Sequence, residues 1–202
     1  MKVAITAVSG HLGSEIAQEL VMEIGAAHVL GTARTLSKAE NLGITELPGD
    51  YNSRSDFDKA LKGVDVVIIV SGMDAPEKRI EQHRNIINAA KAAGVRKVVY
   101  SSIIGDDGNG QIFNLAGESI SQTQLAAYLN TAFSTSLVYE EMSPEEYLSF
   151  QQNVNGEFLG KLIAGIYLKI RQGEFNVQSD FEAAAGRKHL EWKDYFISLK
   201  QS

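Results

Sequence analysis

Two glycines near the N-terminus have the spacing of a phosphate-binding turn. Gly10 and Gly13 follow a short apolar run at residues 2–6 and precede a segment with helical periodicity. In a strand–turn–helix unit, Gly10 lets the backbone approach a pyrophosphate, Gly13 lets the helix pack closely on the strand, and the helix N-terminus faces the phosphates. The alternative is a well-packed turn that holds no ligand. The candidate contacts here are Thr6, Ser9, Gly10, His11, Leu12 and Gly13.

The turn departs from the usual pattern at one position. Ala7 stands where dinucleotide-binding turns have their first glycine. Its Cβ disfavours a positive φ and narrows a tight turn. The motif by itself therefore leaves open whether a dinucleotide binds.

Composition indicates a globular protein. The chain has 202 residues, of which 44% are hydrophobic, enough for a main domain and a smaller lobe. It has no cysteine, so a disulfide framework and a thiolate zinc site are excluded. The sequence shows no signal-like or membrane-spanning apolar stretch, and we expect a cytoplasmic protein without a membrane partner.

Charge is distributed unevenly along the chain. Residues 1–105 contain 12 basic and 12 acidic residues, whereas residues 106–202 contain 7 and 13. An acidic second half without a basic patch argues against a nucleic-acid partner, because neutralising phosphates requires clustered Lys and Arg.

The first hundred residues alternate strand and helix signals. We expect strands near residues 3–6, 28–33, 44–48, 64–70 and 95–101. Helices are expected at 14–24, 37–42, 55–61 and 79–93. The continuous apolar run at 64–70 predicts a strand buried on both faces. We expect an α/β, Rossmann-like, doubly wound parallel sheet with right-handed crossovers and the strand order 3-2-1-4-5.

Polar residues follow the ends of these strands, where a dinucleotide would lie. Arg34 and Lys38 follow the second strand and favour a 2′-phosphate over the two free hydroxyls of NAD, or else are solvated charges. The third and fourth strands end at Asp50-Tyr51 and Ser71-Gly72, candidates for the adenine and the nicotinamide side. Tyr100 and Ser101 end the fifth strand; they position the nicotinamide or are merely strand-end residues.

Several segments together resemble the NmrA-like branch of the atypical short-chain dehydrogenases/reductases, of the NADPH:quinone oxidoreductase and triphenylmethane reductase type. These are residues 3–13, Arg34, 49–51, 82–95, 98–102, 113–118 and 121–127, with parts of 138–187. The resemblance covers nearly the whole chain. It implies NADP bound on the N-terminal sheet, and a quinone or other small electron acceptor under a C-terminal lobe.

The chain differs from this family in length. Residues 101–110 pass almost directly into 111–113, where the family has a further helix, strand and substrate-lining segment. We therefore expect an internal deletion, a cofactor domain at 1–105 and a shortened, mostly helical acceptor lobe at 111–202. A deletion of this kind uncovers apolar sheet surface, so we expect a homodimer or poor solubility.

No catalytic residue or metal site is predicted. Ordinary short-chain dehydrogenases use Tyr-x-x-x-Lys, in which the lysine lowers the pKa of the tyrosine, and no tyrosine here has lysine at that spacing. His83 falls on the apolar face of its helix, which favours packing. The histidines do not have the spacing of metal ligands.

The second half predicts helices at 121–130, 157–171 and 192–199, a further helix opening at Pro144, and a short strand at 137–139. Three functions remain open. The first is an NADPH-dependent oxidoreductase acting on quinones. The second is a non-catalytic NmrA-like redox sensor, and the third is a scaffold that has lost cofactor binding.

Overall fold

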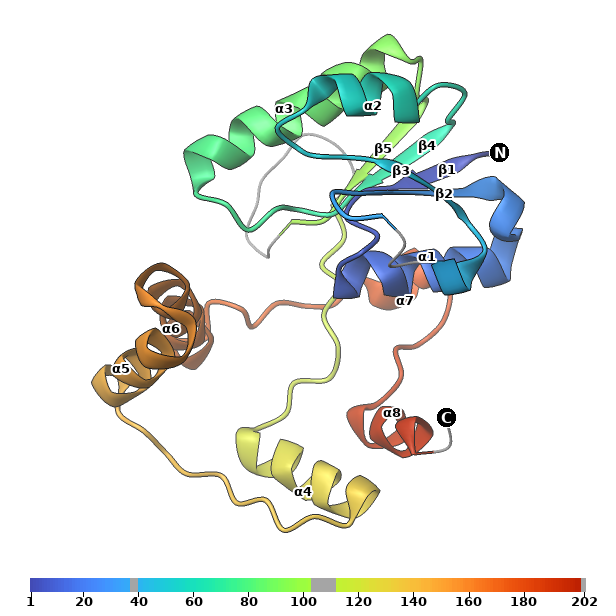
Figure 1. Ribbon diagram of the computed structural model, residues 1–202. Coiled ribbons are helices and arrows are strands. Elements are labelled where there is room, and N and C mark those ends of the chain that lie inside the picture. The colour runs from blue at the N-terminus through green and yellow to red at the C-terminus, as the bar shows by residue number, and fades with distance from the viewer. Residues whose placement is uncertain (37–39, 103–111, 201–202) are drawn as a thin grey trace. The chain divides into compact units, whose positions relative to one another are not determined.

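The computed structural model describes residues 1–36, 40–102 and 112–200. The chain divides into two compact units, Met1–Ile103 and Ile104–Ser202. The first is a five-stranded parallel sheet with helices on both faces, and the second is helical (Figure 1). The expected domain junction at 105–110 lies outside the described residues.

The sheet has the expected strand order, β3-β2-β1-β4-β5. Its strands are β1 (Val3–Ile5), β2 (Val29–Ala33), β3 (Thr45–Pro48), β4 (Val66–Ile69) and β5 (Lys97–Tyr100), and all neighbours pair in parallel. Because parallel strands end at one edge, the segments after β1, β2, β3 and β4 meet there. That edge holds the candidate site.

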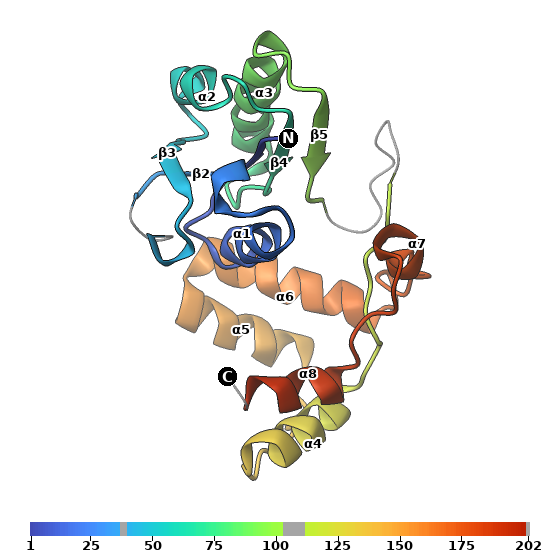
Figure 2. The same ribbon diagram turned by 90° about the vertical axis from the view of Figure 1, so that its right-hand side faces the viewer.

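Three helices complete this unit. Helix α1 (His11–Ile24) packs on one face of the sheet, and α2 (Arg54–Ala60) and α3 (Pro76–Ala92) pack on the other (Figure 2). Helix α1 begins at His11, three residues before the expected start at residue 14. Two short 3₁₀ turns, η1 (Ala26–His28) and η2 (Glu40–Leu42), connect the remaining elements; residues 37–39 of the helix expected at 37–42 lie outside the described residues.

The core has two parts, one on each face of the sheet. Beneath α2 and α3, Phe57, Leu61 and Ile86 pack on the sheet residues Leu30 and Val67. On the other face, α1 packs Ala17 against Ile5, Val8 and Val29. The sheet is thus anchored on both sides at β1 and β2, the strands that carry the candidate phosphate turn and Arg34.

The prediction that β4 is buried on both faces is wrong in part. Val67 and Ile69 are fully buried, whereas Val66 and Ile68 are half-buried. Of the helices described in this unit, α1 alone lies on that face, and it packs mainly against β1 and β2. All residues of β5 are exposed, including Val98 at 43%. The far edge of the sheet therefore lacks a helical cover among the described residues of this unit.

The second unit contains α4 (Gln122–Phe133), α5 (Pro144–Asn155), α6 (Glu157–Arg171), α7 (Phe181–Ala185) and α8 (Trp192–Leu199). Ser121 and Ser143 cap α4 and α5 through complete capping boxes, with Gln124 and Glu146 as partners. Helix α5 begins at Pro144, where the sequence analysis expected a helix to open. Residues 137–139 form no strand, since no neighbouring strand among the described residues offers a partner for their backbone.

Helices α5 and α6 form an antiparallel pair, visible in Figure 2. Gly160 makes the close approach possible: a Cβ there would lie 2.5 Å from the Cα of Gln152. The rings of Tyr147 and Tyr167 meet 5.3 Å apart across the pair. Helix α6 is nevertheless largely exposed, and Gly160 is its one buried residue.

Candidate functional site

The turn between β1 and α1 is built around Ala7. Its φ is 52°, so the chain adopts at alanine the left-handed conformation that glycine usually provides. The amide of Gly10 donates to the Ala7 carbonyl at 2.9 Å. A Cβ at Gly13 would lie 2.3 Å from that same oxygen, so only glycine allows α1 to approach the turn this closely. Alanine in place of the usual first glycine thus strains the turn but does not change the path of its backbone.

This strain predicts the effect of Ala7→Gly. A non-glycine residue in the left-handed region costs about 1–2 kcal/mol, partly offset in the exchange by the greater freedom of glycine in the unfolded chain. We expect Ala7→Gly to raise the free energy of unfolding by about 0.5–1 kcal/mol. Urea unfolding followed by circular dichroism measures it. Ala127→Gly, in helix α4, is the control and should lower the free energy of unfolding by about 1 kcal/mol. An equal loss of stability in both variants would show that Ala7 is not strained.

The N-terminus of α1 opens into a pocket of about 450 Å³. The N-cap residue is Gly10, no side chain caps the helix, and its first turn has no acidic residue. The first amides of a helix have no partner within it, so here they are directed toward the pocket with the positive end of the helix dipole. Ser9, Gly10, His11, Leu12 and Gly13, all named as candidate contacts from the sequence, line this pocket.

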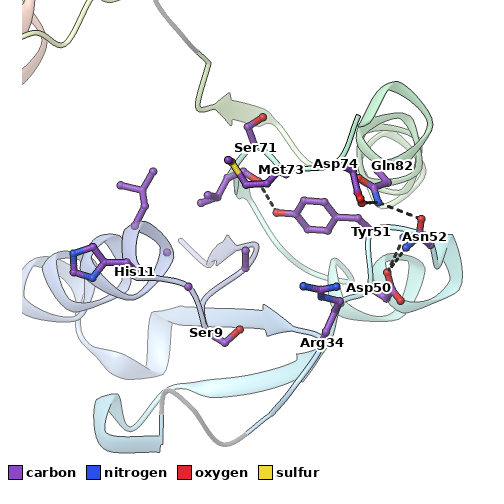
Figure 3. Close-up of a pocket in the computed structure, with 17 residues that line it drawn as sticks. Ser9, His11, Arg34, Asp50, Tyr51, Asn52, Ser71, Met73, Asp74 and Gln82 are labelled. Atoms are coloured by element: carbon purple, nitrogen blue, oxygen red, sulfur yellow. Dashed lines mark hydrogen bonds between the residues drawn. The ribbon is translucent and has the colours of Figure 1, made fainter. Parts of the chain in front are cut away.

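Arg34, just beyond β2, lies on the same pocket between the glycine turn and Asp50 (Figure 3). Its side chain is exposed and forms no ion pair within the described residues. No acidic residue stands at the end of β2, where NAD-binding sites place one. Lys38, the second basic candidate, lies outside the described residues.

Tyr51 is held by a closed ring of hydrogen bonds. Its hydroxyl donates to the Val70 carbonyl at 2.6 Å, the Val70 amide donates to the Thr6 hydroxyl at 2.9 Å, and the Thr6 and Tyr51 hydroxyls lie 2.5 Å apart. Since the Tyr51 proton goes to Val70, the Thr6 hydroxyl donates to Tyr51. Burial raises the pKa of Tyr51, which keeps it a neutral phenol.

Thr6 was predicted as a cofactor contact, and the structure places it elsewhere. It is fully buried and does not line the pocket. Its hydroxyl joins the end of β1 to Tyr51 and to β4, because a buried hydroxyl must find partners inside the protein. Asp50 and Tyr51 do line the pocket, and the Asp50 carboxylate accepts from the backbone and side chain of Asn52.

One wall of the pocket is an amide–carboxylate network that the sequence analysis missed. The Gln82 amide donates to Asp74 at 2.6 Å and to Asn52 at 3.2 Å (Figure 3). The hydrogen bond from Gln82, followed by the one from Lys78, lowers the pKa of Asp74. Gln82 is nearly fully buried, although a helix position in the middle of α3 gives no sign of this.

The segment after β4 forms the remaining wall. The candidate contacts Ser71 and Gly72 line the pocket, together with Val70 and Met73. The Ser101 hydroxyl accepts from the Ser71 amide at 2.9 Å, so Ser101 holds the wall from behind. Neither Ser101 nor Tyr100 lines the pocket itself. The lining residues that sequence reasoning missed are Ala7, Gly49, Asn52, Val70, Met73, Asp74 and Gln82.

These residues fit a phosphorylated dinucleotide. The uncapped helix terminus and the glycine turn offer amides to a pyrophosphate, and the planar Arg34 guanidinium offers donors to a further phosphate on the same pocket. Within the described residues no group of three or more His, Asp or Glu side chains is placed to hold a metal ion.

A family model described as NAD(P)H-binding matches residues 8–135, more than half of the chain. The chain belongs to this NAD(P)H-binding family. Within the atypical short-chain dehydrogenases/reductases the chain is NmrA-like. One of its relatives is an NmrA-like family domain-containing oxidoreductase from Aspergillus flavus. That relative is 28% identical over 109 residues, which cover 51% of this chain and 36% of the relative.

Another member of the family covers more of the chain. Quinone oxidoreductase 2 of Escherichia coli is 31% identical over 190 residues, which are 92% of this chain and 63% of the relative. The chain thus spans less than two thirds of that relative's length.

Solved structures agree on the fold. Triphenylmethane reductase of Citrobacter sp., complexed with NADP(H), superposes with a TM-score of 0.79 at 20% identity, covering 99% of both chains. The Escherichia coli quinone oxidoreductase complexed with NADPH superposes with a TM-score of 0.74 at 20% identity, covering 98% of this chain and 99% of the other. In the part of the chain that the structure describes, no helix is both long and apolar enough to span a membrane.

Proposed function

We propose that this protein is an NADPH-dependent oxidoreductase that transfers a hydride to a quinone or a similar small acceptor. The observation that carries the proposal is the position of Arg34 on the same pocket as the glycine turn and the N-terminus of α1. A basic side chain there suits a 2′-phosphate, and the uncapped amides suit a pyrophosphate. Residues 1–105 then act as the cofactor domain and 111–202 as an acceptor lobe.

In this proposal each wall of the pocket has one task. The amides at the start of α1 bind the pyrophosphate, with His11 beside it. Arg34, with Lys38 near it in sequence, binds the 2′-phosphate, and Asp50 and Tyr51 border the adenine. Ser71 and Gly72 border the nicotinamide end, and Tyr100 and Ser101 contact Ser71 from outside the pocket lining. The bound cofactor supplies the hydride, so the protein's contribution is binding and orientation.

The acceptor is inferred from relatives. Quinone oxidoreductase 2 matches 92% of this chain in sequence, and both superposed reductases were crystallised with the phosphorylated cofactor. Reduction of a quinone by hydride does not depend on the Tyr-x-x-x-Lys pair that this chain lacks. An acceptor that needs no such pair is therefore consistent with the residues present.

A fluorescence titration with NADPH and NADH tests the cofactor, and turnover with menadione tests the acceptor. We expect micromolar binding of NADPH, binding of NADH at least about tenfold weaker, and NADPH oxidation that depends on menadione. Binding without turnover would favour a redox sensor. That alternative also agrees with the chain covering only 63% of the length of quinone oxidoreductase 2. If neither nucleotide binds, the remaining hypothesis is a scaffold that has lost cofactor binding.

Self-association is part of the proposal. Large apolar side chains are exposed on α6, and Val98 and Val99 are exposed on β5. Exposed apolar surface of this extent marks an association site or promotes aggregation. We expect sedimentation velocity at micromolar concentration to show a homodimer, the commonest closed assembly, or loss of material to aggregates. A stable monomer would contradict this expectation.

A further inference from the structure

His83 has a partner at each ring nitrogen, and this determines where its proton lies. The amide of Gly72 donates to Nε2 at 3.3 Å, and the Tyr100 hydroxyl lies 3.1 Å from Nδ1. A backbone amide can only donate, so Nε2 must be the acceptor. A neutral imidazole then carries its hydrogen on Nδ1, and Nδ1–H donates to the oxygen of Tyr100.

The surroundings of His83 keep it neutral. Its burial, and then the positive charge of Arg79, lower its pKa. The ring contacts Tyr100 edge-on at 5.2 Å and Tyr51 at 6.1 Å. Because Tyr51 is itself fixed by Thr6 and Val70, the imidazole has a rigid support on that side.

The proton of Tyr100 is therefore directed away from His83. The tyrosine oxygen already accepts from Nδ1, and its own hydrogen is left for another acceptor. The hydroxyl of Ser71, which lines the pocket, lies 3.4 Å away. Tyr100 is 43% exposed as a residue, so a small molecule beside Ser71 can contact its side chain.

We propose that Tyr100 is the catalytic acid that protonates the reduced acceptor, with His83 and Ser71 as its positioning residues. The inference rests on the proposed function and deepens it by assigning the proton. It also gives His83 a role that helix periodicity had attributed to packing.

The step balances for a quinone. A quinone that has taken up a hydride is a hydroquinone monoanion and needs one proton to become the hydroquinone. The O–H bond of Tyr100 breaks, and a new O–H bond forms on the quinone's anionic oxygen. Nδ1–H of His83 stabilises the tyrosinate, which then recovers a proton from water. A tyrosine and a hydroquinone are both phenols, so the O–H bond that breaks and the O–H bond that forms are of the same kind.

Two acceptors separate this step from hydride transfer. Menadione needs a proton after it receives a hydride. The cationic dye crystal violet takes the hydride at its central carbon and becomes a neutral product without any proton. We expect Tyr100→Phe to lower kcat with menadione by roughly 100-fold and to change kcat with crystal violet less than about twofold. A solvent deuterium isotope effect is expected for menadione and not for the dye.

Two further variants make the comparison specific. Tyr195→Phe removes the hydroxyl of a tyrosine in α8 that is 42% exposed as a residue, close to the value for Tyr100, and should leave both rates unchanged. His83→Phe retains an aromatic ring and removes the Nδ1 donor. It should lower the menadione rate by roughly tenfold, less than Tyr100→Phe does, again without affecting the dye.

A second readout needs neither cofactor nor turnover. Long-range ¹H–¹⁵N correlation spectra of the wild-type protein report which imidazole nitrogen carries hydrogen, and we expect Nδ1 for His83. Hydrogen on Nε2 would overturn the proposal. So would equal menadione rates for wild type and Tyr100→Phe while crystal violet is still reduced, a result that leaves the proposed function standing. Absence of NADPH oxidation with either acceptor would instead overturn the proposed function and, with it, the role of Tyr100.

Discussion

Gly13→Ala should abolish cofactor binding and destabilise the sheet unit. The added Cβ would lie 2.3 Å from the Ala7 carbonyl oxygen and 2.8 Å from its carbon, and both are backbone atoms that cannot move aside cheaply. Relief requires α1 to shift away from the turn. We expect the free energy of unfolding to fall by about 3 kcal/mol, the upper part of the usual cost of overpacking, and NADPH fluorescence titration to show no saturation.

Gly165→Ala is the matched control. Gly165 lies within α6 with no atom in the space that a Cβ would occupy and no positive φ, so the exchange should be neutral or stabilise by up to about 1 kcal/mol. Urea unfolding measures both variants. Wild-type affinity for NADPH in Gly13→Ala would show that the pyrophosphate does not depend on the close approach of α1 to the turn.

Arg34→Ala should remove the preference for NADPH. A charge-assisted contact to a phosphate contributes about 1.5–3 kcal/mol, so the dissociation constant for NADPH should rise roughly 10- to 100-fold. NADH lacks the 2′-phosphate and should bind within about twofold of wild type. Arg34→Lys should recover part of the loss, because lysine restores the charge and not the planar pair of donors.

Arg54→Ala provides the control for net charge. Arg54 is an exposed arginine of the same unit that pairs with Asp58 on α2 and does not line the pocket. Its loss should leave both affinities unchanged. An equal weakening of NADPH and NADH binding by Arg34→Ala would place the arginine at the pyrophosphate instead, and the 2′-phosphate assignment would be wrong.

The elements that could be predicted are those with local causes. The bounds of α6 and α8 follow from helical spacing at residues 157–171 and 192–199, and the start of α5 follows from a serine cap with proline after it. The strand order was predicted because alternating strands and helices with right-handed crossovers leave few possible topologies, and the handedness depends on the chirality of the chain.

The predictions that were wrong share a different cause. Residues 137–139 have strand-like composition and form no strand, because a strand needs a partner that local sequence does not specify. Ile80 and Ile87 fit an apolar stripe on α3 and are exposed, whereas Gln82 is buried. Gln82 is buried because Asp74 and Asn52, from two other segments, satisfy its amide.

For the site, the sequence by itself determined which residues stand at the ends of the strands: the glycine turn, Arg34, Asp50-Tyr51 and Ser71-Gly72. Those positions depend on short-range patterns of apolar, glycine and polar residues. Only the tertiary structure decided that Ala7 adopts a positive φ, that Thr6 faces Tyr51, and that His83, Tyr100 and Ser71 form one chain of contacts. The physical reason is that these hydrogen bonds join residues far apart in sequence. They form only once folding brings their elements together, so no local sequence pattern specifies them.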